Sequence, residues 1–152
     1  MVIVAFYSYP EQPTKLVLTS EYRIPIGCRE ISFPAGLIDE TDYVEGETIR
    51  AAACRAAVRE MKEETGLDFT PTEVSPDNLY SSAGMTNESV CYVIGHATGS
   101  PTTAGNEATE DIRVMLCNRS DVIRIVDNKQ EEAISKTAWL FLWSFKYNGF
   151  PM

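Results

Sequence analysis

Apolar and polar positions along the chain fall into short apolar runs separated by turn-forming segments. The runs are rich in β-branched and aromatic residues, as buried strands are. The runs that predict strands are residues 2–8, 15–19, 31–33, 90–94 and 112–116. Residues 68–78 are polar and contain two prolines, and the small residues at 99–105 predict a loop.

Two longer segments show apolar positions at helical spacing. Thr48 to Thr65 is rich in alanine, a strong helix former, and Gly66 follows at the position where a helix commonly ends. The small alanine side chains also allow close packing against a sheet. Glu131 to Asn148 carries a broad apolar stripe that predicts a second helix.

The order of strands, helix, strands and helix favours an α+β fold in which a mixed β-sheet is sandwiched between α-helices. A length of 152 residues with 44% hydrophobic content suits one domain, residues 1–152, with a substantial core. No internal repeat or interdomain linker is visible in the sequence.

Composition and charge exclude several classes of function. A net charge of −9 argues against nonspecific DNA binding, which needs a basic surface. No apolar run is long enough to span a membrane, and the apolar N-terminus lacks a charged leader, so it predicts a strand and not a signal peptide. One histidine leaves little for a zinc site or a catalytic triad. Four scattered cysteines suit the thiols of a cytoplasmic protein.

Glu60, Glu63 and Glu64 concentrate negative charge near the end of the first predicted helix. Positions i, i+3 and i+4 share one helical face, so the three carboxylates repel one another unless a cation neutralises them. Mg²⁺ prefers carboxylate oxygens, and this face therefore predicts a metal site. The alternative interpretation is a solvated acidic surface, which is common on helices and needs no function.

Residues 59–67 and 33–39 together resemble a known motif. The segment 59–67 matches the pattern Arg-Glu-apolar-x-Glu-Glu-x-Gly-apolar, the core of the Nudix box. The segment 33–39 is similar to the start of that box in the ADP-ribose pyrophosphatase branch of the Nudix hydrolases. The resemblance extends weakly over most of the chain. It implies the Nudix fold, a mixed sheet between helices, and hydrolysis of a pyrophosphate.

The spacing within the motif differs from that of the family, which has five residues between the glycine and a glutamate and seven more before the arginine. Here ten residues separate Gly36 from Glu47, and eleven separate Glu47 from Arg59. Arg55 stands at the seven-residue spacing from Glu47, but an alanine follows it. We therefore take Arg59 and Glu60 as the register, with the additional turn upstream, and the role of Glu47 stays open.

The resemblance assigns roles to the residues that match the box. Glu60 and Glu64 correspond to the main metal ligands, Glu63 shares the cluster, and the backbone carbonyl of Ala35 corresponds to a further ligand. Arg59 corresponds to the arginine that orients the glutamates. Arg59, Glu63 and Glu64 are thus expected to act in catalysis, with Mg²⁺ (or Mn²⁺) as the cofactor.

Three further positions follow from the same resemblance. Glu110, with Glu107 as the alternative, lies in a loop where many family members carry a catalytic glutamate, although a solvated acidic loop fits the sequence equally well. Arg23 matches an arginine that contacts substrate phosphate, and an exposed structural arginine is the other interpretation. Gly84 lies in a segment similar to a substrate motif of the ADP-ribose branch, with Ala83 in place of the marker proline.

These observations together predict a Mg²⁺-dependent Nudix hydrolase that cleaves the pyrophosphate of a nucleoside diphosphate derivative, with ADP-ribose-like substrates first. The alternatives are nucleoside triphosphates, nucleotide sugars or capped RNA as substrates, or a non-catalytic Nudix domain that senses a nucleotide. The intact glutamates favour the enzyme. A small nucleotide is the expected partner, DNA and membranes are not, and a homodimer is left open.

Overall fold

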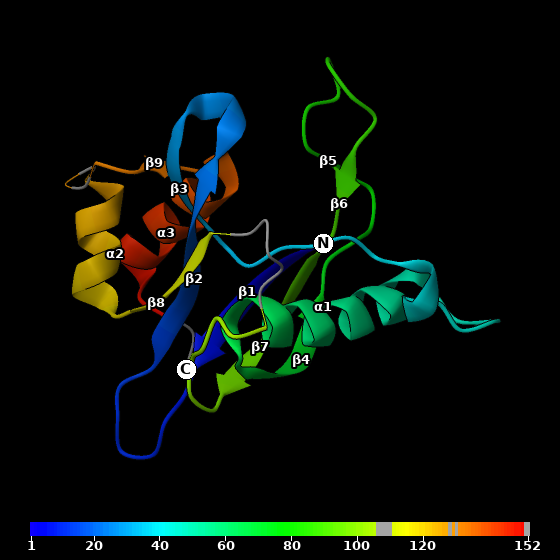
Figure 1. Ribbon diagram of the computed structural model, residues 1–152, viewed down its shortest axis with the longest axis horizontal. Helices are drawn as coiled ribbons and strands as arrows, with labels where there is room; N and C mark the ends of the chain where they lie inside the picture. The colour runs from blue at the N-terminus through cyan, green and yellow to red at the C-terminus, as the bar shows by residue number, and fades with distance from the viewer. Residues whose placement is uncertain (106–110, 128, 130, 151–152) are drawn as a thin grey trace.

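The computed structural model describes residues 1–105, 111–127, 129 and 131–150, which form a sheet with helices on both sides (Figure 1). The helices are α1 (Ile49–Thr65), α2 (Arg119–Val126) and α3 (Lys136–Asn148). The strands are β1 (Val2–Tyr7), β2 (Lys15–Arg23), β3 (Cys28–Ser32), β4 (Asp68–Val74), β5 (Leu79–Tyr80), β6 (Ser89–Val90), β7 (Tyr92–Thr98), β8 (Ile112–Cys117) and β9 (Ala133–Ile134). Two short 3₁₀ turns, η1 (Ile24–Ile26) and η2 (Glu40–Asp42), lie in connecting segments.

Strand β1 lies in the interior of a mixed seven-stranded sheet. It pairs in parallel with β7 and antiparallel with β2, in the order β4–β7–β1–β2–β3–β9. Strand β2 is long enough to pair with β1 near its start, with β3 near its end, and with β8. Strands β5 and β6 form a separate hairpin that projects from the body of the molecule (Figure 1). The expected α+β fold, with a mixed sheet between helices, is confirmed.

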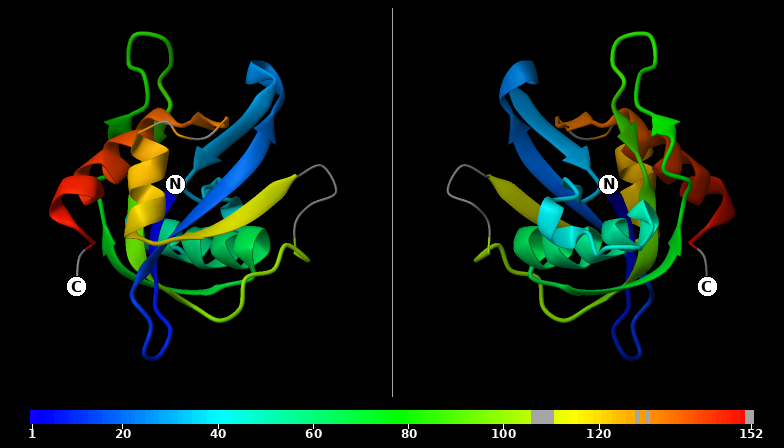
Figure 2. Two further views of the ribbon diagram at one scale, coloured as in Figure 1. Left: turned by 90° about the vertical axis from the view of Figure 1, so that its left-hand side faces the viewer. Right: turned by 90° about the vertical axis from the view of Figure 1, so that its right-hand side faces the viewer.

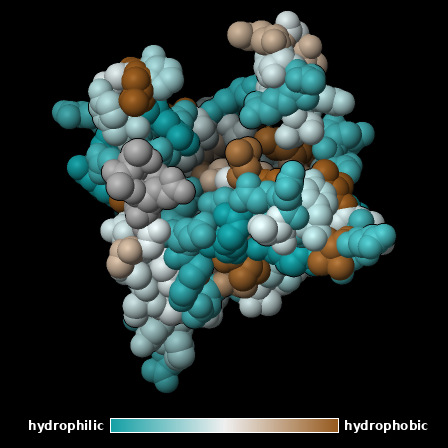
Figure 3. Space-filling view, turned by 45° about the vertical axis from the view of Figure 1, so that its right-hand side comes forward, coloured by the Kyte–Doolittle hydropathy of each residue, from teal (hydrophilic) through white to brown (hydrophobic). Residues whose placement is uncertain are grey.

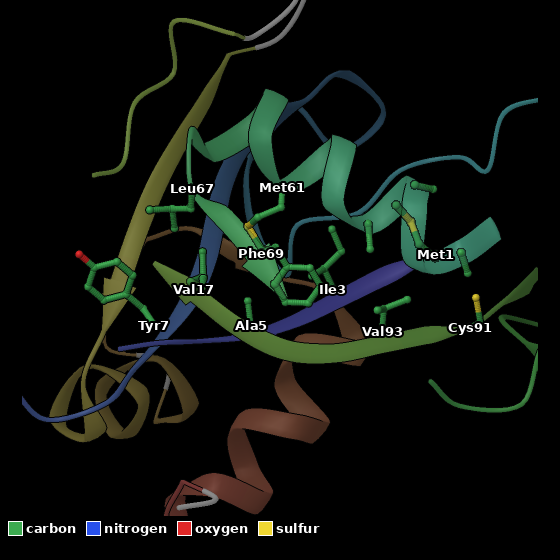
Figure 4. Close-up of a cluster of buried hydrophobic side chains, with 14 residues drawn as sticks. Met1, Ile3, Ala5, Tyr7, Val17, Met61, Leu67, Phe69, Cys91 and Val93 are labelled. Atoms are coloured by element: carbon green, nitrogen blue, oxygen red, sulfur yellow. The ribbon is translucent and has the colours of Figure 1, made fainter. Parts of the chain in front are cut away.

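Alternate residues of β1 divide between two hydrophobic cores, because successive side chains of a strand point to opposite faces of the sheet. Ile3, Ala5 and Tyr7 belong to the core beneath α1 (Figure 4). Val4 and Phe6 belong to the core beneath α2 and α3. Figure 2 shows α1 on one side of the sheet and the other two helices on the opposite side. The sheet is therefore the middle of three layers.

Helix α1 is capped at both ends, and its end at Gly66 is the one expected from the sequence. The Thr48 side chain accepts a hydrogen bond from the Ala51 amide, and Gly66 ends the helix in the left-handed conformation with φ of 71°. Alanines and Met61 form the buried face, which brings the helix close to the sheet. Arg59 and the three glutamates of the last turns meet the segment that follows β3.

The polar segment 68–78, where no strand was predicted, contains one. Strand β4 forms at the edge of the sheet beside β7, and its register shifts between Pro71 and Glu73. A proline cannot donate a hydrogen bond to a neighbouring strand, but an edge strand with a bulge accommodates one. The strand was therefore not predicted, because prolines and polar residues are uncommon in strands.

The C-terminal third also differs from the expectation. Helix α2 was not predicted, although the Asn118 side chain accepts hydrogen bonds from two backbone amides at its start. The helix expected from Glu131 to Asn148 begins later, at Lys136, because β9 first pairs with β3 and Ser135 then caps α3. Within the described residues, no helix is long and apolar enough to cross a membrane.

Candidate active site

A cavity of about 320 Å³ opens beside the C-terminal half of α1, and we call it the acidic cavity. Helix α1 and the segment that follows β3 provide most of its walls. The residues that line it are Ala35, Gly36, Leu37, Asp39, Arg59, Glu60, Glu63, Glu64 and Gly105. In the space-filling view the molecule is hollowed between two projections, the β2–β3 hairpin and the β5–β6 hairpin (Figure 3).

Arg59 makes the largest set of hydrogen bonds in this cavity. Its Nη1 donates to Glu60 Oε1 at 2.9 Å and to Glu63 Oε2 at 3.1 Å. Its Nη2 donates to the Leu37 carbonyl at 3.2 Å. One guanidinium thus joins α1 to the preceding loop and fixes the orientation of two of the three glutamates.

Asp42 is a residue of this site that the motif comparison missed. Its buried carboxylate accepts a hydrogen bond from Arg59 Nη2 at 3.0 Å, and Asp39 Oδ2 lies at the same distance from that nitrogen. Burial alone would raise the pKa of Asp42, but hydrogen bonds from Arg59 and from the Asp39 amide, with the arginine charges, lower it overall. The sequence did carry a signal, because five residues separate Gly36 from Asp42, the family spacing from the glycine to its glutamate.

Glu60 and Glu64 are the least exposed carboxylates lining the acidic cavity. The Glu64 residue is 9% exposed. Burial raises the pKa of Glu60 in spite of the opposing hydrogen bond from Arg59. Gly36 approaches Glu60 so closely that a Cβ at this position would lie 2.2 Å from Glu60 Cδ. A larger residue at this point of the loop would therefore displace the Glu60 side chain.

Arg55, one helical turn before Arg59, takes a different position. Its Nη2 lies 2.5 Å from Glu47 Oε2, and its Nε donates to the Asp42 carbonyl at 2.8 Å. Arg55 does not line the acidic cavity. The two arginines therefore hold the same loop at different points, and Arg59 is the one that contacts the glutamates.

A second cavity of about 340 Å³ adjoins the acidic cavity, and Ala35 lines both. We call it the second cavity. Its lining comes from β2, β3, the β5–β6 hairpin and the start of α3, and its charged members are Arg23, Glu30 and Lys136. Arg23 Nη1 lies 2.9 Å from Glu21 Oε2, and its Nε lies 3.6 Å from Glu30 Oε2. The arginine expected to contact phosphate thus already has two carboxylate partners.

The remaining expected residues lie elsewhere. Gly84 lies in the β5–β6 hairpin, in an open hollow that shares Tyr80 with the second cavity. Glu110 and its alternative, Glu107, lie outside the described residues, and both stay predictions from the sequence. Gly105, which precedes them, lines the acidic cavity.

The donor set of the acidic cavity suits a hard divalent cation. Glu60, Glu63 and Glu64 offer carboxylate oxygens, and the backbone at Ala35 lines the same cavity. Among the described residues, no group of three or more histidine, cysteine or acidic side chains is already arranged as a metal cluster. Arg59 donates to both Glu60 and Glu63 in this arrangement, so its N–H groups satisfy oxygens that a cation would otherwise take.

Residues 2–138 match the NUDIX domain family. A Caenorhabditis elegans protein whose name describes it as a nudix hydrolase is 34% identical over 124 residues, which cover 78% of this chain and 52% of the relative. The ADP-ribose pyrophosphatase of Saccharomyces cerevisiae is 37% identical over 82 residues, which cover 54% of this chain and 31% of that protein. The chain therefore spans about half the length of the first relative and about a third of the second.

Solved structures share this fold at low sequence identity. A C. elegans Ap4A hydrolase in a binary complex matches with a TM-score of 0.54 at 18% identity, over 95% of this chain and 92% of that one. The solution structure of the E. coli ORF135 protein matches with a TM-score of 0.50 at 16% identity, over 95% and 86% of the two chains. These two likenesses show the fold alone. The match over residues 2–138, together with the motif at the acidic cavity, shows that this chain belongs to the Nudix domain family.

Proposed function

We propose that this chain hydrolyses the pyrophosphate of a nucleoside diphosphate derivative with the help of a divalent cation, and that ADP-ribose-like molecules are its preferred substrates. The observation that carries the proposal is the meeting of Glu60, Glu63 and Glu64 with Arg59 in one cavity, which adjoins a second, nucleoside-sized cavity. Membership of the Nudix family supports it, and so do two relatives that are named as hydrolases.

The roles proposed for the acidic residues follow from their surroundings. Glu60 and Glu64, which are little exposed, would hold Mg²⁺ or Mn²⁺ together with the Ala35 carbonyl. A cation at this place would neutralise pyrophosphate charge and lower the pKa of the attacking water. Glu63, whose side chain is 50% exposed, reaches solvent and is suited to accept a proton.

Arg59 supports the glutamates as a permanently charged partner. Its hydrogen bond to Asp42 raises the pKa of Arg59, so the guanidinium keeps its charge throughout the working range of an enzyme. Because the same side chain donates to Glu60 and Glu63, it balances part of their mutual repulsion. Arg59 is therefore proposed to position the carboxylates of Glu60 and Glu63.

The second cavity is proposed to bind the nucleoside end of the substrate. Its volume of about 340 Å³ and the aromatic rings of Tyr80 and Tyr92 suit a stacked base. Arg23 would exchange a carboxylate partner for a phosphate oxygen, since a guanidinium binds both kinds of group in the same geometry. The name of the S. cerevisiae relative, an ADP-ribose pyrophosphatase, favours ADP-ribose as the first substrate to examine.

A substrate panel with Mg²⁺ tests the proposal. The measurement compares kcat/KM for ADP-ribose, other ADP- and UDP-sugars, nucleoside triphosphates and capped RNA, read as release of nucleoside monophosphate or phosphate. We expect ADP-ribose to rank first, with other sugars and bases accepted, because Ala83 replaces the marker proline of the ADP-ribose branch. A clear preference for triphosphates would move the substrate to that class. Nucleotide binding without any turnover would favour a sensing domain.

A further inference from the structure

Two cations line the second cavity, and they differ in what already surrounds them. Arg23 lies beside Glu21 and Glu30, at 2.9 Å and 3.6 Å. Lys136 donates from Nζ to the Ser81 carbonyl at 2.9 Å, and no carboxylate in the described part of the chain lies within ion-pair distance of it. An ammonium group carries three protons, so two donors of Lys136 remain for a ligand.

The place of Lys136 in the cavity limits which part of a ligand it can reach. Lys136 begins α3 and faces the β5–β6 hairpin, whereas Ala35 marks the junction with the acidic cavity. A substrate with its pyrophosphate in the acidic cavity passes Ala35 and places its nucleoside in the second cavity. Tyr80, Tyr92 and Leu140 provide the apolar surface for the base. The ribose then lies among the polar groups of the wall, where Lys136 is the cation without a carboxylate.

The chemistry of an ammonium group without a counter-ion favours an anionic ligand. The whole chain carries a net charge of −9, and Lys136, an exposed lysine at the cavity wall without a carboxylate partner, is a local exception that attracts negative groups. A neutral ribose hydroxyl would gain only an ordinary hydrogen bond from it. A phosphate monoester offers three acceptor oxygens and a charge-assisted hydrogen bond, which is shorter and stronger.

We propose that Lys136 forms an anion subsite in the second cavity that binds a phosphate on the 2′- or 3′-oxygen of the substrate's ribose. This inference rests on the proposed function, and it narrows the substrates to nucleoside diphosphate derivatives that carry one additional phosphate on the nucleoside. Lys136 also holds the β5–β6 hairpin through Ser81. The ligand phosphate and the hairpin thus share one donor group, and binding of the phosphate keeps the hairpin beside α3.

Equilibrium binding of three mononucleotides tests this subsite without any need for turnover. The probes are AMP, 2′,5′-ADP and 3′,5′-ADP, titrated calorimetrically in Mg²⁺ buffer into the wild-type chain and its variants. Lys136→Met removes the charge at nearly constant volume, and Lys136→Arg keeps it. Lys129→Met is the matched control, since Lys129 is 69% exposed, lies near Asp127 and lines neither cavity.

We expect one of the two bisphosphates to bind the wild type about tenfold more tightly than AMP, the scale of a hydrogen bond to a charged group. Lys136→Met should remove that gain, so that this variant binds the bisphosphate no more tightly than it binds AMP, while Lys136→Arg and Lys129→Met retain the gain. Equal affinity for all three probes in the wild type, no binding of any probe, or a preference that survives in Lys136→Met would overturn the subsite. An equal loss of AMP affinity in Lys136→Met would also overturn it. A chain that binds as expected but hydrolyses nothing would instead contradict the proposed function.

Discussion

The acidic cavity and the second cavity meet at Ala35, yet they are built in opposite ways. In the acidic cavity polar groups fix one another, since the single side chain of Arg59 donates to Glu60, Glu63 and Asp42. The walls of the second cavity combine apolar and polar residues from separate elements, with contacts such as that of Lys136 between them. Networks of polar groups that fix one another suit chemistry, whereas apolar surface with polar groups placed among it suits recognition. Changes in the first cavity should therefore lower kcat, and changes in the second should raise KM.

The largest effect is expected from Glu64→Gln, which removes the charge of a buried carboxylate with little change in volume. The variant should fold and lose about 10³-fold in kcat for ADP-ribose, the scale of losing a key electrostatic group. Steady-state kinetics and thermal unfolding measure the two properties. Glu45→Gln, an exposed residue outside both cavities, is the control and should match the wild type. Activity within a few-fold of the wild type in Glu64→Gln would remove the acidic cavity as the reaction centre.

Gly36→Ala should come second. The new Cβ would meet Glu60 Cδ at 2.2 Å, so the glutamate must move away from the loop. A displacement of about 1 Å in a reacting group costs about 10²-fold in rate. We expect kcat to fall on that scale while KM changes little, as measured with ADP-ribose at saturating Mg²⁺. Unchanged kinetics would show that the close approach of the loop to Glu60 is irrelevant to turnover.

Two of the three arginines of α1, Arg59 and Arg55, allow a finer comparison at the acidic cavity. Arg59→Met should lower kcat about 10- to 100-fold, as expected for a residue that orients metal-binding carboxylates. Arg55→Met should have a much smaller effect, because the hydrogen bonds and ion pair of Arg55 in the described part of the chain go to the Asp42 carbonyl and Glu47 and not to the glutamates of the acidic cavity. Measuring kcat of the two variants side by side shows which arginine supports catalysis. A larger loss in Arg55→Met would mean that the register at Glu47 is the functional one.

A change in the second cavity should show the opposite kinetic signature. Arg23→Met should raise KM for ADP-ribose about fivefold or less and leave kcat nearly unchanged, because the side chain is partly exposed and its ion pairs are weak. Arg124→Met, on α2 and outside both cavities, should have no effect. A fall in kcat without a change in KM would place Arg23 with the reacting groups and break the division between the cavities.

The smallest expected effect is on stability and its pH dependence. The pKa of Asp42 is lowered in the folded chain, so its ionised form contributes stability above the unfolded pKa, near 3.8. This contribution is lost as the pH falls through the lower, folded pKa. Asp42→Asn should therefore melt below the wild type at pH 7, and the gap should close as the pH is lowered beneath about 4. Melting curves across that range measure it. A gap that is constant with pH would mean that the Asp42 charge does not contribute.

The same contrast explains how much of the site was predictable. The acidic face depends on helical spacing, so Glu60, Glu63 and Glu64 were placed together from the sequence, and the end of the helix at Gly66 was also predicted. Helix geometry is local, and a motif within one helix fixes which side chains meet. The five-residue spacing after Gly36 also points to Asp42 as the partner of Arg59. Asp42 was nevertheless missed, because the family has a glutamate at that spacing.

The second cavity depends on contacts that no local pattern specifies. Arg23 and Lys136 lie far apart in the chain and are brought to one cavity by the pairing of β2 with β3 and the packing of α3. The strand containing Pro71 was missed for a similar reason, since pairing with β7 at the sheet edge outweighed its poor local propensity for a strand. Contacts between distant parts of the chain therefore determine both the second cavity and the strand at Pro71.

The dependence of ADP-ribose hydrolysis on a divalent cation tests the central claim most directly. Release of AMP is followed with the wild-type chain in excess chelator and then with increasing Mg²⁺ or Mn²⁺. The acidic cavity, with Glu60, Glu63 and Glu64 as its oxygen donors, predicts no turnover in chelator and a saturable return of activity with either metal. Undiminished turnover in excess chelator would contradict the assignment of the acidic cavity as a metal-dependent pyrophosphatase centre.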